Sequence, residues 1–229
     1  MIISHKYKFI FIKTVKTAGT SIETYLSQHC GEDDILTPFG RAEAGHKPRN
    51  YQGEFDPSLE IALTQGEAAK TAREELQQRT KFYNHMPAYL VRCRVSEQIW
   101  KDYFKFCVER NPWDKVISHY YFMKGRWSLN MSLDEFIPNY PCLNYPRYTE
   151  YHDHDRVMVD RVLRYEKLNE ELAHVFGLLH IPFAGALTIR AKGDYRSDRR
   201  PYQAILTDQQ RRLIEQIYNR EIQLHDYRY

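Results

Sequence analysis

Three short segments of the sequence contain side chains that could bind an anion and act on it. The first, residues 13–21 (KTVKTAGTS), stands between an apolar stretch and a stretch with helical spacing. A helix N-terminus attracts anions through its backbone N–H groups and its dipole. Gly19 allows the backbone to come close to a ligand, and Lys16 adds a point charge. Further hydroxyl donors are Thr17, Thr20 and Ser21. An ordinary Thr- and Ser-rich helix cap has the same residue types, so both interpretations stay open here.

The other two segments contain arginines. Residues 110–121 read RNPWDKVISHYY, with Arg110 after an apolar stretch and Ser118 about two helical turns later. An arginine binds phosphate through its planar fork, and a serine adds one hydrogen bond. A surface arginine and an ordinary helical serine give the same pattern, so that alternative stays open. Residues 195–200 (YRSDRR) are a basic segment late in the chain. An anion-binding loop and an ordinary solvated loop are both open interpretations of it. The ATP-loop pattern G-x-x-x-x-G-K-[ST] does not occur in the sequence, which disfavours an ATP site.

The predicted elements would bring these segments to one edge of a sheet. Apolar stretches predict strands over residues 7–12, 104–108 and 157–164. Helical spacing and capping signals predict helices over residues 21–30, 66–79, 88–103 with a break near Ser96, 113–123, 132–137, 166–176 and 207–224. This alternation predicts one α/β domain over residues 1–229, with a central, mostly parallel sheet flanked by helices. Ligands of such sheets bind at the carboxyl ends of the strands.

Taken together, the segments resemble one family, the sulfotransferases that use 3′-phosphoadenosine-5′-phosphosulfate (PAPS), and most closely its carbohydrate-type and bacterial branch. Residues 16–21 (KTAGTS) are similar to the 5′-phosphosulfate loop of that family, and residues 110–121 to its 3′-phosphate motif. Weaker similarities occur at residues 84–88 and 163–168, and Val15 stands where the family usually has proline. The resemblance implies the P-loop-like fold of these enzymes.

The resemblance also implies a role for each segment. It implies that the 5′-phosphosulfate is held by Lys16, Thr17, Ala18, Gly19, Thr20 and Ser21. It assigns the 3′-phosphate to Arg110 and Ser118. Arg196 or Ser197 would complete that pocket, and Tyr165 would lie near the adenine. PAPS would be the donor and the bisphosphate PAP the product, and such a good leaving group needs no metal ion.

Sulfuryl transfer should follow the logic of phosphoryl transfer, an in-line displacement with charge spread over the equatorial oxygens. Lys16 is suited to neutralise charge on the bridging oxygen as PAP departs. The attacking group must lose a proton, and a histidine is the natural general base. Among ten histidines we select His85, because Asn84-His85 resembles the position of the family's base. His119 follows Ser118 directly and is interpreted as structural.

The acceptor is less well marked by the sequence. The resemblance implies transfer to a hydroxyl or amine of a carbohydrate or small metabolite. His46, Arg49 and His152 are the candidates for binding it, because basic and polar groups suit sugars and acidic glycans. Ordinary solvated loops are the alternative for both segments. The run His-Asp-His-Asp over residues 152–155 is too tightly spaced for a preformed structural zinc site, so we expect no metal there.

Composition excludes several other functions. The chain has 229 residues, 42% of them hydrophobic, and a formal net charge of +3, which is too balanced for a protein that coats nucleic acid. No apolar run approaches the 18 residues of a membrane span, no signal peptide is visible, and the four cysteines form no CxxC pair. We therefore expect a cytoplasmic protein without nucleic-acid or membrane partners, and a homodimer stays open. The alternatives to a sulfotransferase are a phosphoryl-transfer enzyme and a non-catalytic anion- or glycan-binding module.

Overall fold

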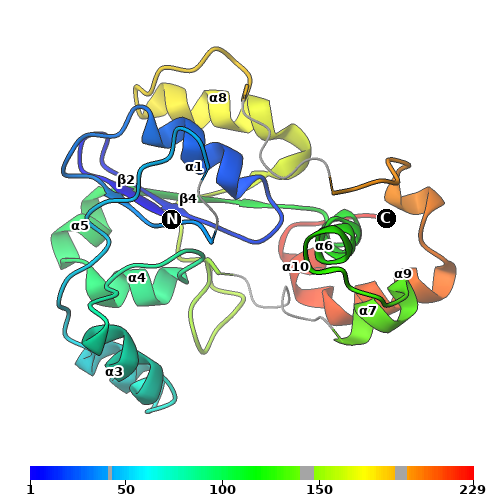
Figure 1. Cartoon of the computed structure of the whole chain (residues 1–229), viewed down its shortest axis with the longest axis horizontal. Helices are drawn as coiled ribbons and strands as arrows, with labels where there is room; N and C mark the ends of the chain where they lie inside the picture. The colour runs from blue at the N-terminus through cyan, green and yellow to red at the C-terminus, as the bar shows by residue number, and fades with distance from the viewer. Residues whose placement is uncertain (41–42, 140–146, 189–194) are drawn as a thin grey trace.

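A five-stranded sheet forms the centre of the protein (Figure 1), in a computed structural model that describes residues 1–40, 43–139, 147–188 and 195–229. The strands are β1 (Ile2–Ser4), β2 (Phe9–Ile12), β3 (Ile35–Leu36), β4 (Phe104–Glu109) and β5 (Arg161–Arg164). Their order across the sheet is β3-β1-β2-β4-β5. Strands β2, β4 and β5 are parallel, and β1 is antiparallel to both of its neighbours. Four of the five strands thus run in one direction, which confirms the mostly parallel α/β sheet.

The sheet is buried on both faces, and β2 shows how its sequence achieves this. Phe9 and Phe11 pack on one face with α1 (Gly19–Ser27) and α8 (Leu168–Leu178). Ile10 and Ile12 pack on the other face with α4 (Ala88–Arg94). Figure 1 shows these helices on opposite sides of the strands. An uninterrupted apolar strand of this kind is typical of a parallel strand covered on both faces.

Seven further helices and two short 3-10 turns complete the described structure. They are α2 (Ser58–Leu63), α3 (Ala69–Gln77), α5 (Glu97–Asp102), α6 (Pro112–Trp127), α7 (Leu133–Asn139), α9 (Asp208–Ile217) and α10 (Asn219–Leu224), with 3-10 turns η1 (Tyr165–Lys167) and η2 (Tyr202–Ala204). Helices α6, α7 and α9 share a separate apolar core around Trp113 and Ile214. Each helix in the described ranges is too short or too polar to span a bilayer.

Several boundaries differ from the sequence expectations. The strand expected over residues 157–164 is present only as β5, because Met158 donates its N–H to the Tyr148 carbonyl and so pairs outside the sheet. The single helix expected over residues 207–224 is wrong, since α9 and α10 are separated at Tyr218. The break near Ser96 is confirmed: its hydroxyl accepts the Ile99 N–H at 3.2 Å and caps α5. Strands β1 and β3 and helix α2 were not expected.

Helix α6 begins directly after the carboxyl end of β4, and local chemistry sets that boundary. Asn111 is the capping residue, and its side-chain oxygen accepts the N–H groups of Trp113 and Asp114. Pro112 occupies the first helical position, where a missing N–H costs nothing. The first turn of α6 is therefore fixed rigidly beside the edge of the sheet.

Candidate anion-binding active site

One cavity of about 900 Å³ opens at the carboxyl ends of β2 and β4. It brings together most of the residues that the sequence singled out. The expected residues in its wall are Lys16, Thr17, Ala18, Gly19, Thr20, Ser21, His85, Arg110, Ser118, Tyr165 and Arg196. Residues widely separated in the chain thus share one site.

The loop between β2 and α1 has a tight backbone that carries the chain into the helix. Lys16 and Ala18 have positive φ angles of 62° and 59°, and Ala18 is the capping residue of α1. A Cβ atom on Gly19 would lie 2.7 Å from Cγ of Lys13, so only glycine fits there without a shift. The Thr14 hydroxyl donates to the Val108 carbonyl and ties the loop to β4. The N-terminus of α1 is consequently held at the cavity, where its dipole favours an anion.

The two lysines of this loop have different surroundings. Lys13 forms a buried ion pair with Glu23, with Nζ 2.5 Å from Oε2. Lys16 lies with Nζ 4.1 Å from the centre of the Phe122 ring, which also lines the cavity. Lys13 therefore stabilises the base of the loop, whereas Lys16 supplies charge at the cavity wall.

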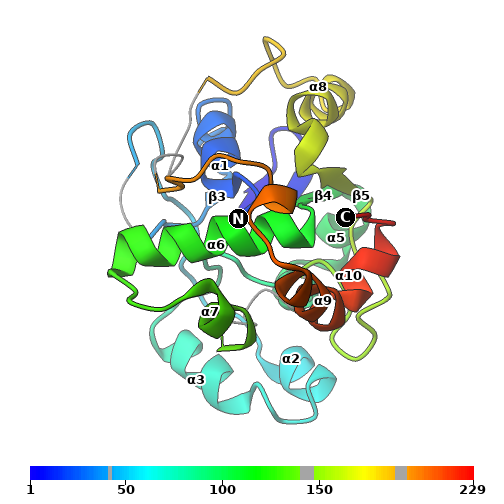
Figure 2. The same ribbon diagram turned by 90° about the vertical axis from the view of Figure 1, so that its right-hand side faces the viewer.

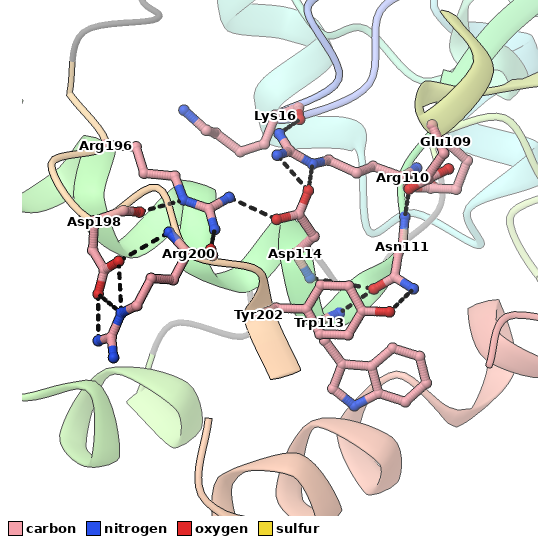
Figure 3. Close-up of polar contacts among 11 residues, drawn as sticks. Lys16, Glu109, Arg110, Asn111, Trp113, Asp114, Arg196, Asp198, Arg200 and Tyr202 are labelled. Carbon is pink, nitrogen blue, oxygen red and sulfur yellow. Dashed lines mark hydrogen bonds and ion pairs between the residues drawn. The ribbon is translucent and has the colours of Figure 1, made fainter. Parts of the chain in front are cut away.

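Arg110 connects three parts of the site (Figure 3). Its Nε and Nη2 donate to Oδ2 of Asp114 at 2.9 and 2.6 Å, and its Nη1 donates to the Lys16 carbonyl at 3.0 Å. Its guanidinium carbon lies 4.1 Å from the centre of the Tyr165 ring. The side-on fork expected for phosphate is thus occupied by Asp114. Three of the five N–H groups are used, which leaves one on each terminal nitrogen for a ligand.

His85 is held as a neutral ring. Its Nδ1 lies 3.1 Å from the Lys13 carbonyl, and a carbonyl can only accept, so Nδ1 carries the hydrogen and Nε2 keeps a lone pair. Burial, followed by the positive charge of Lys13, lowers the pKa of His85 to about 2. At neutral pH the ring is therefore uncharged, with the lone pair of Nε2 unprotonated.

His119 also lines the cavity, although the sequence analysis interpreted it as structural. Its ring packs edge-on against Phe136, with 5.3 Å between the ring centres. Burial lowers the pKa of His119 to about 4, and the charges of Lys16 and Lys115 act in the same direction. It is a second neutral imidazole in the wall of the site.

The residues expected to bind the acceptor are not in the described wall of this cavity. His46 and His152 each bond a backbone carbonyl through Nε2, at 2.9 and 2.7 Å. Arg49 donates to three backbone carbonyls, and Ser197 is exposed and away from the cavity lining. His46, His152 and Arg49 therefore hold loops together through hydrogen bonds to the backbone.

Three residues that shape the site lie in the segments singled out by the sequence but were given no role of their own. Tyr195 and Arg199 line the cavity, and Asp114 contacts both Arg110 and Arg196. The position of Asp114, four residues after Arg110 on a helix, was a usable signal for an ion pair. Over the described part of the chain, no group of three or more His, Cys, Asp or Glu side chains is placed to hold a metal ion.

These features define an α/β protein with a cationic cavity at the N-terminus of α1, suited to a multiply charged anion. A family model described as the sulfotransferase family matches residues 1–228, so the chain belongs to the sulfotransferase family. An uncharacterized protein of Archaeoglobus fulgidus is 39% identical over 101 residues, which are 42% of this chain and 84% of that protein. No solved structure matches the chain.

Proposed function

We propose that the protein transfers a sulfuryl group from PAPS to a hydroxyl or amine of a carbohydrate or small metabolite. The observation that carries this proposal is the single cavity shared by Lys16, Arg110 and His85. Such a cavity offers a cation for the transferred group, an arginine for a second anionic group, and a base. The β2–loop–α1 arrangement supports a P-loop-like binding mode.

The residues of the cavity fit this donor in size and charge. Its volume of about 900 Å³ lies within the ~300–1,000 Å³ of sites for small ligands. The basic residues of the described wall are Lys13, Lys16, Arg110, Lys167, Arg196 and Arg199. The acidic ones are Glu166 and Glu170. Glu23 and Asp114, which are outside the lining, pair with Lys13 and with the two arginines Arg110 and Arg196. The positive excess that remains suits a ligand with a phosphosulfate and a further phosphate.

Each end of the donor has suitable partners. The N-terminus of α1 and Lys16 would hold the 5′-phosphosulfate, and Arg110 with Ser118 would hold the 3′-phosphate. Arg110 already covers one face of the Tyr165 ring, so the adenine would contact the other face or the edge. Bound PAPS supplies an activated sulfuryl group and a stable leaving group, so the protein provides mainly positioning and electrostatics.

The chemistry then needs one base and one cation. His85 takes the proton of the acceptor hydroxyl on Nε2 while the acceptor oxygen forms its bond to sulfur. The bond from sulfur to the bridging oxygen breaks at the same time, and Lys16 stabilises the charge left on the departing PAP. The negative charge of the donor would oppose the field of Lys13 and so raise the pKa of His85, although burial, the larger cause of the low pKa, is unchanged by that charge.

The test is a transfer assay with labelled PAPS and a panel of sugar, amine and small-hydroxyl acceptors. Lys16→Ala and Arg110→Ala should weaken PAP binding, and His85→Ala should lower turnover with PAP binding retained. His174→Ala changes an exposed histidine of α8 outside the described lining and is the matched control. PAP binding without transfer or hydrolysis would instead indicate a binding module, and turnover that requires ATP and Mg²⁺ would indicate phosphoryl transfer.

A further inference from the structure

Residues 195–200 lie beside helix α6, in the orange segment that approaches it in Figure 2. Besides His119, four positions of α6 line the cavity or contact this segment: Asp114, Ser118, Phe122 and Gly125. Their spacing of four, four and three residues puts them on one face of the helix. We call residues 195–200 the strap.

The first contact between the strap and α6 is steric. Tyr195 packs edge-on against Phe122, with 5.3 Å between the ring centres. A Cβ atom on Gly125 would lie 2.6 Å from Cδ1 of Tyr195. Glycine inside a helix costs about 1 kcal/mol relative to alanine. Its presence at position 125 is explained by the room that the Tyr195 ring needs.

The second contact is an ion pair at the other end of this face. Nη1 of Arg196 donates to Oδ1 of Asp114 at 2.7 Å. The same guanidinium donates through Nε to the Asp198 carbonyl and through Nη2 to the Arg200 carbonyl, at 2.8 and 2.7 Å (Figure 3). Arg196 therefore organises the strap around itself and attaches it to α6.

Asp114 joins this strap to Arg110 through a single carboxylate. Oδ1 accepts from Arg196, and Oδ2 accepts from two nitrogens of Arg110. Asp114 is outside the described cavity lining, whereas both of its arginine partners lie in it. Arg199 also lies in the cavity lining, three residues after the attachment point on the strap.

We propose that Asp114 is a positioning residue that assembles the 3′-phosphate pocket from two distant parts of the chain. It fixes the guanidinium of Arg110 and, through Arg196, docks the strap so that Arg199 faces the 3′-phosphate. The inference rests on the proposed function. It adds Arg199 to the anion contacts of the strap. Arg196 spends three of its five N–H groups on holding the strap and, like Arg110, keeps one on each terminal nitrogen for a ligand.

A positioning role and a purely electrostatic role of Asp114 predict opposite changes in anion affinity for Asp114→Asn. If Asp114 acted only as a nearby negative charge, its removal would strengthen anion binding by Coulomb's law. If it positions both arginines, its removal weakens binding of a ligand with a 3′-phosphate. A ligand without that phosphate should be almost unaffected, which a general loss of structure would not produce.

The experiment measures the affinities of PAP and of 5′-AMP, which lacks the 3′-phosphate, by calorimetry. We expect Asp114→Asn and Arg199→Gln each to weaken PAP binding by about tenfold or more, with 5′-AMP changed less than about twofold. The control variant is Glu215→Gln, which removes a carboxylate on α9. Among the described ion pairs, Glu215 is paired with Arg211 alone. Tighter PAP binding by Asp114→Asn, or an equal loss for both ligands, would overturn the inference. A wild-type protein that does not prefer PAP over 5′-AMP would instead overturn the proposed function.

Docking of the strap is tested without any ligand by limited trypsin cleavage after Arg196 and Arg199. Gly125→Ala should speed this cleavage by roughly fivefold or more, because the added methyl displaces Tyr195. In a Tyr195→Ala background, the same substitution should add nothing to the cleavage rate. Gly177→Ala is the matched control, since a Cβ there meets no atom within 4 Å. An unchanged cleavage rate in Gly125→Ala would overturn the docked strap.

Discussion

Replacing His85 by asparagine separates its proposed role as a base from its role in the fold. His85 has a φ angle of 60°, a conformation that asparagine tolerates better than most residues. The amide nitrogen of asparagine takes the place of Nδ1 and can donate to the Lys13 carbonyl. Nothing then occupies the place of Nε2. The substitution should keep the loop and the binding of PAP but lower turnover by about 10²- to 10⁴-fold.

The same variant has a second signature in the pH dependence of stability. The pKa of His85 is about 2 in the folded protein and near its usual 6.5 in the unfolded chain. Below pH 6.5 the unfolded chain therefore binds more protons, so the free energy of unfolding falls as the pH falls. At pH 5 this loss amounts to about 2 kcal/mol, from one and a half pH units at ~1.36 kcal/mol each.

Urea unfolding of both proteins at pH 7 and pH 5 measures that contribution. Wild type should lose about 2 kcal/mol more than His85→Asn between these two pH values. Because the comparison is a difference between two proteins, the other buried histidines cancel. An identical loss in both proteins would show that His85 is not a buried neutral ring. Full turnover in His85→Asn would refute its assignment as the base.

Three further substitutions test the fold and the loop. Arg94→Met should cost about 3–5 kcal/mol in urea unfolding, because it leaves the fully buried Glu60 without its bidentate partner. Burial raises the pKa of Glu221 to about 7, so the folded protein binds the extra proton and loses stability as the pH rises from 4.5 to 7. Glu221→Gln should therefore stabilise the protein by roughly 3 kcal/mol at pH 8 and by almost nothing at pH 4, as thermal or urea unfolding will show. Gly19→Ala should weaken PAP binding in calorimetry, because its Cβ would clash with the Lys13 stem.

The anion-binding segments could be predicted because each is contiguous and has a local signal. The loop at residues 13–21 follows a buried strand, and Arg110 with Ser118 lies at the start of a helix with a marked cap. The positions of these residues are set by the strand that precedes them or by the helix that they begin. Their meeting in one cavity follows from the parallel order of β2 and β4.

The remainder depends on contacts between distant parts of the chain. The bond between Arg196 and Asp114 spans 82 residues, and no local pattern specifies which oxygen an arginine will reach. Strands β1 and β3 are only three and two residues long, too short for an alternation to be visible. The acceptor candidates His46 and His152 were chosen by residue type alone, and loops carry no periodicity that would place their side chains.

The most direct test of the account is a mass balance for a single reaction with labelled PAPS. We predict that PAP and sulfated acceptor form in equal amounts with at least one acceptor of the panel, and that Lys16→Ala abolishes both. If labelled PAPS stays intact with every acceptor and with water alone, the assignment of sulfuryl transfer to this site is contradicted.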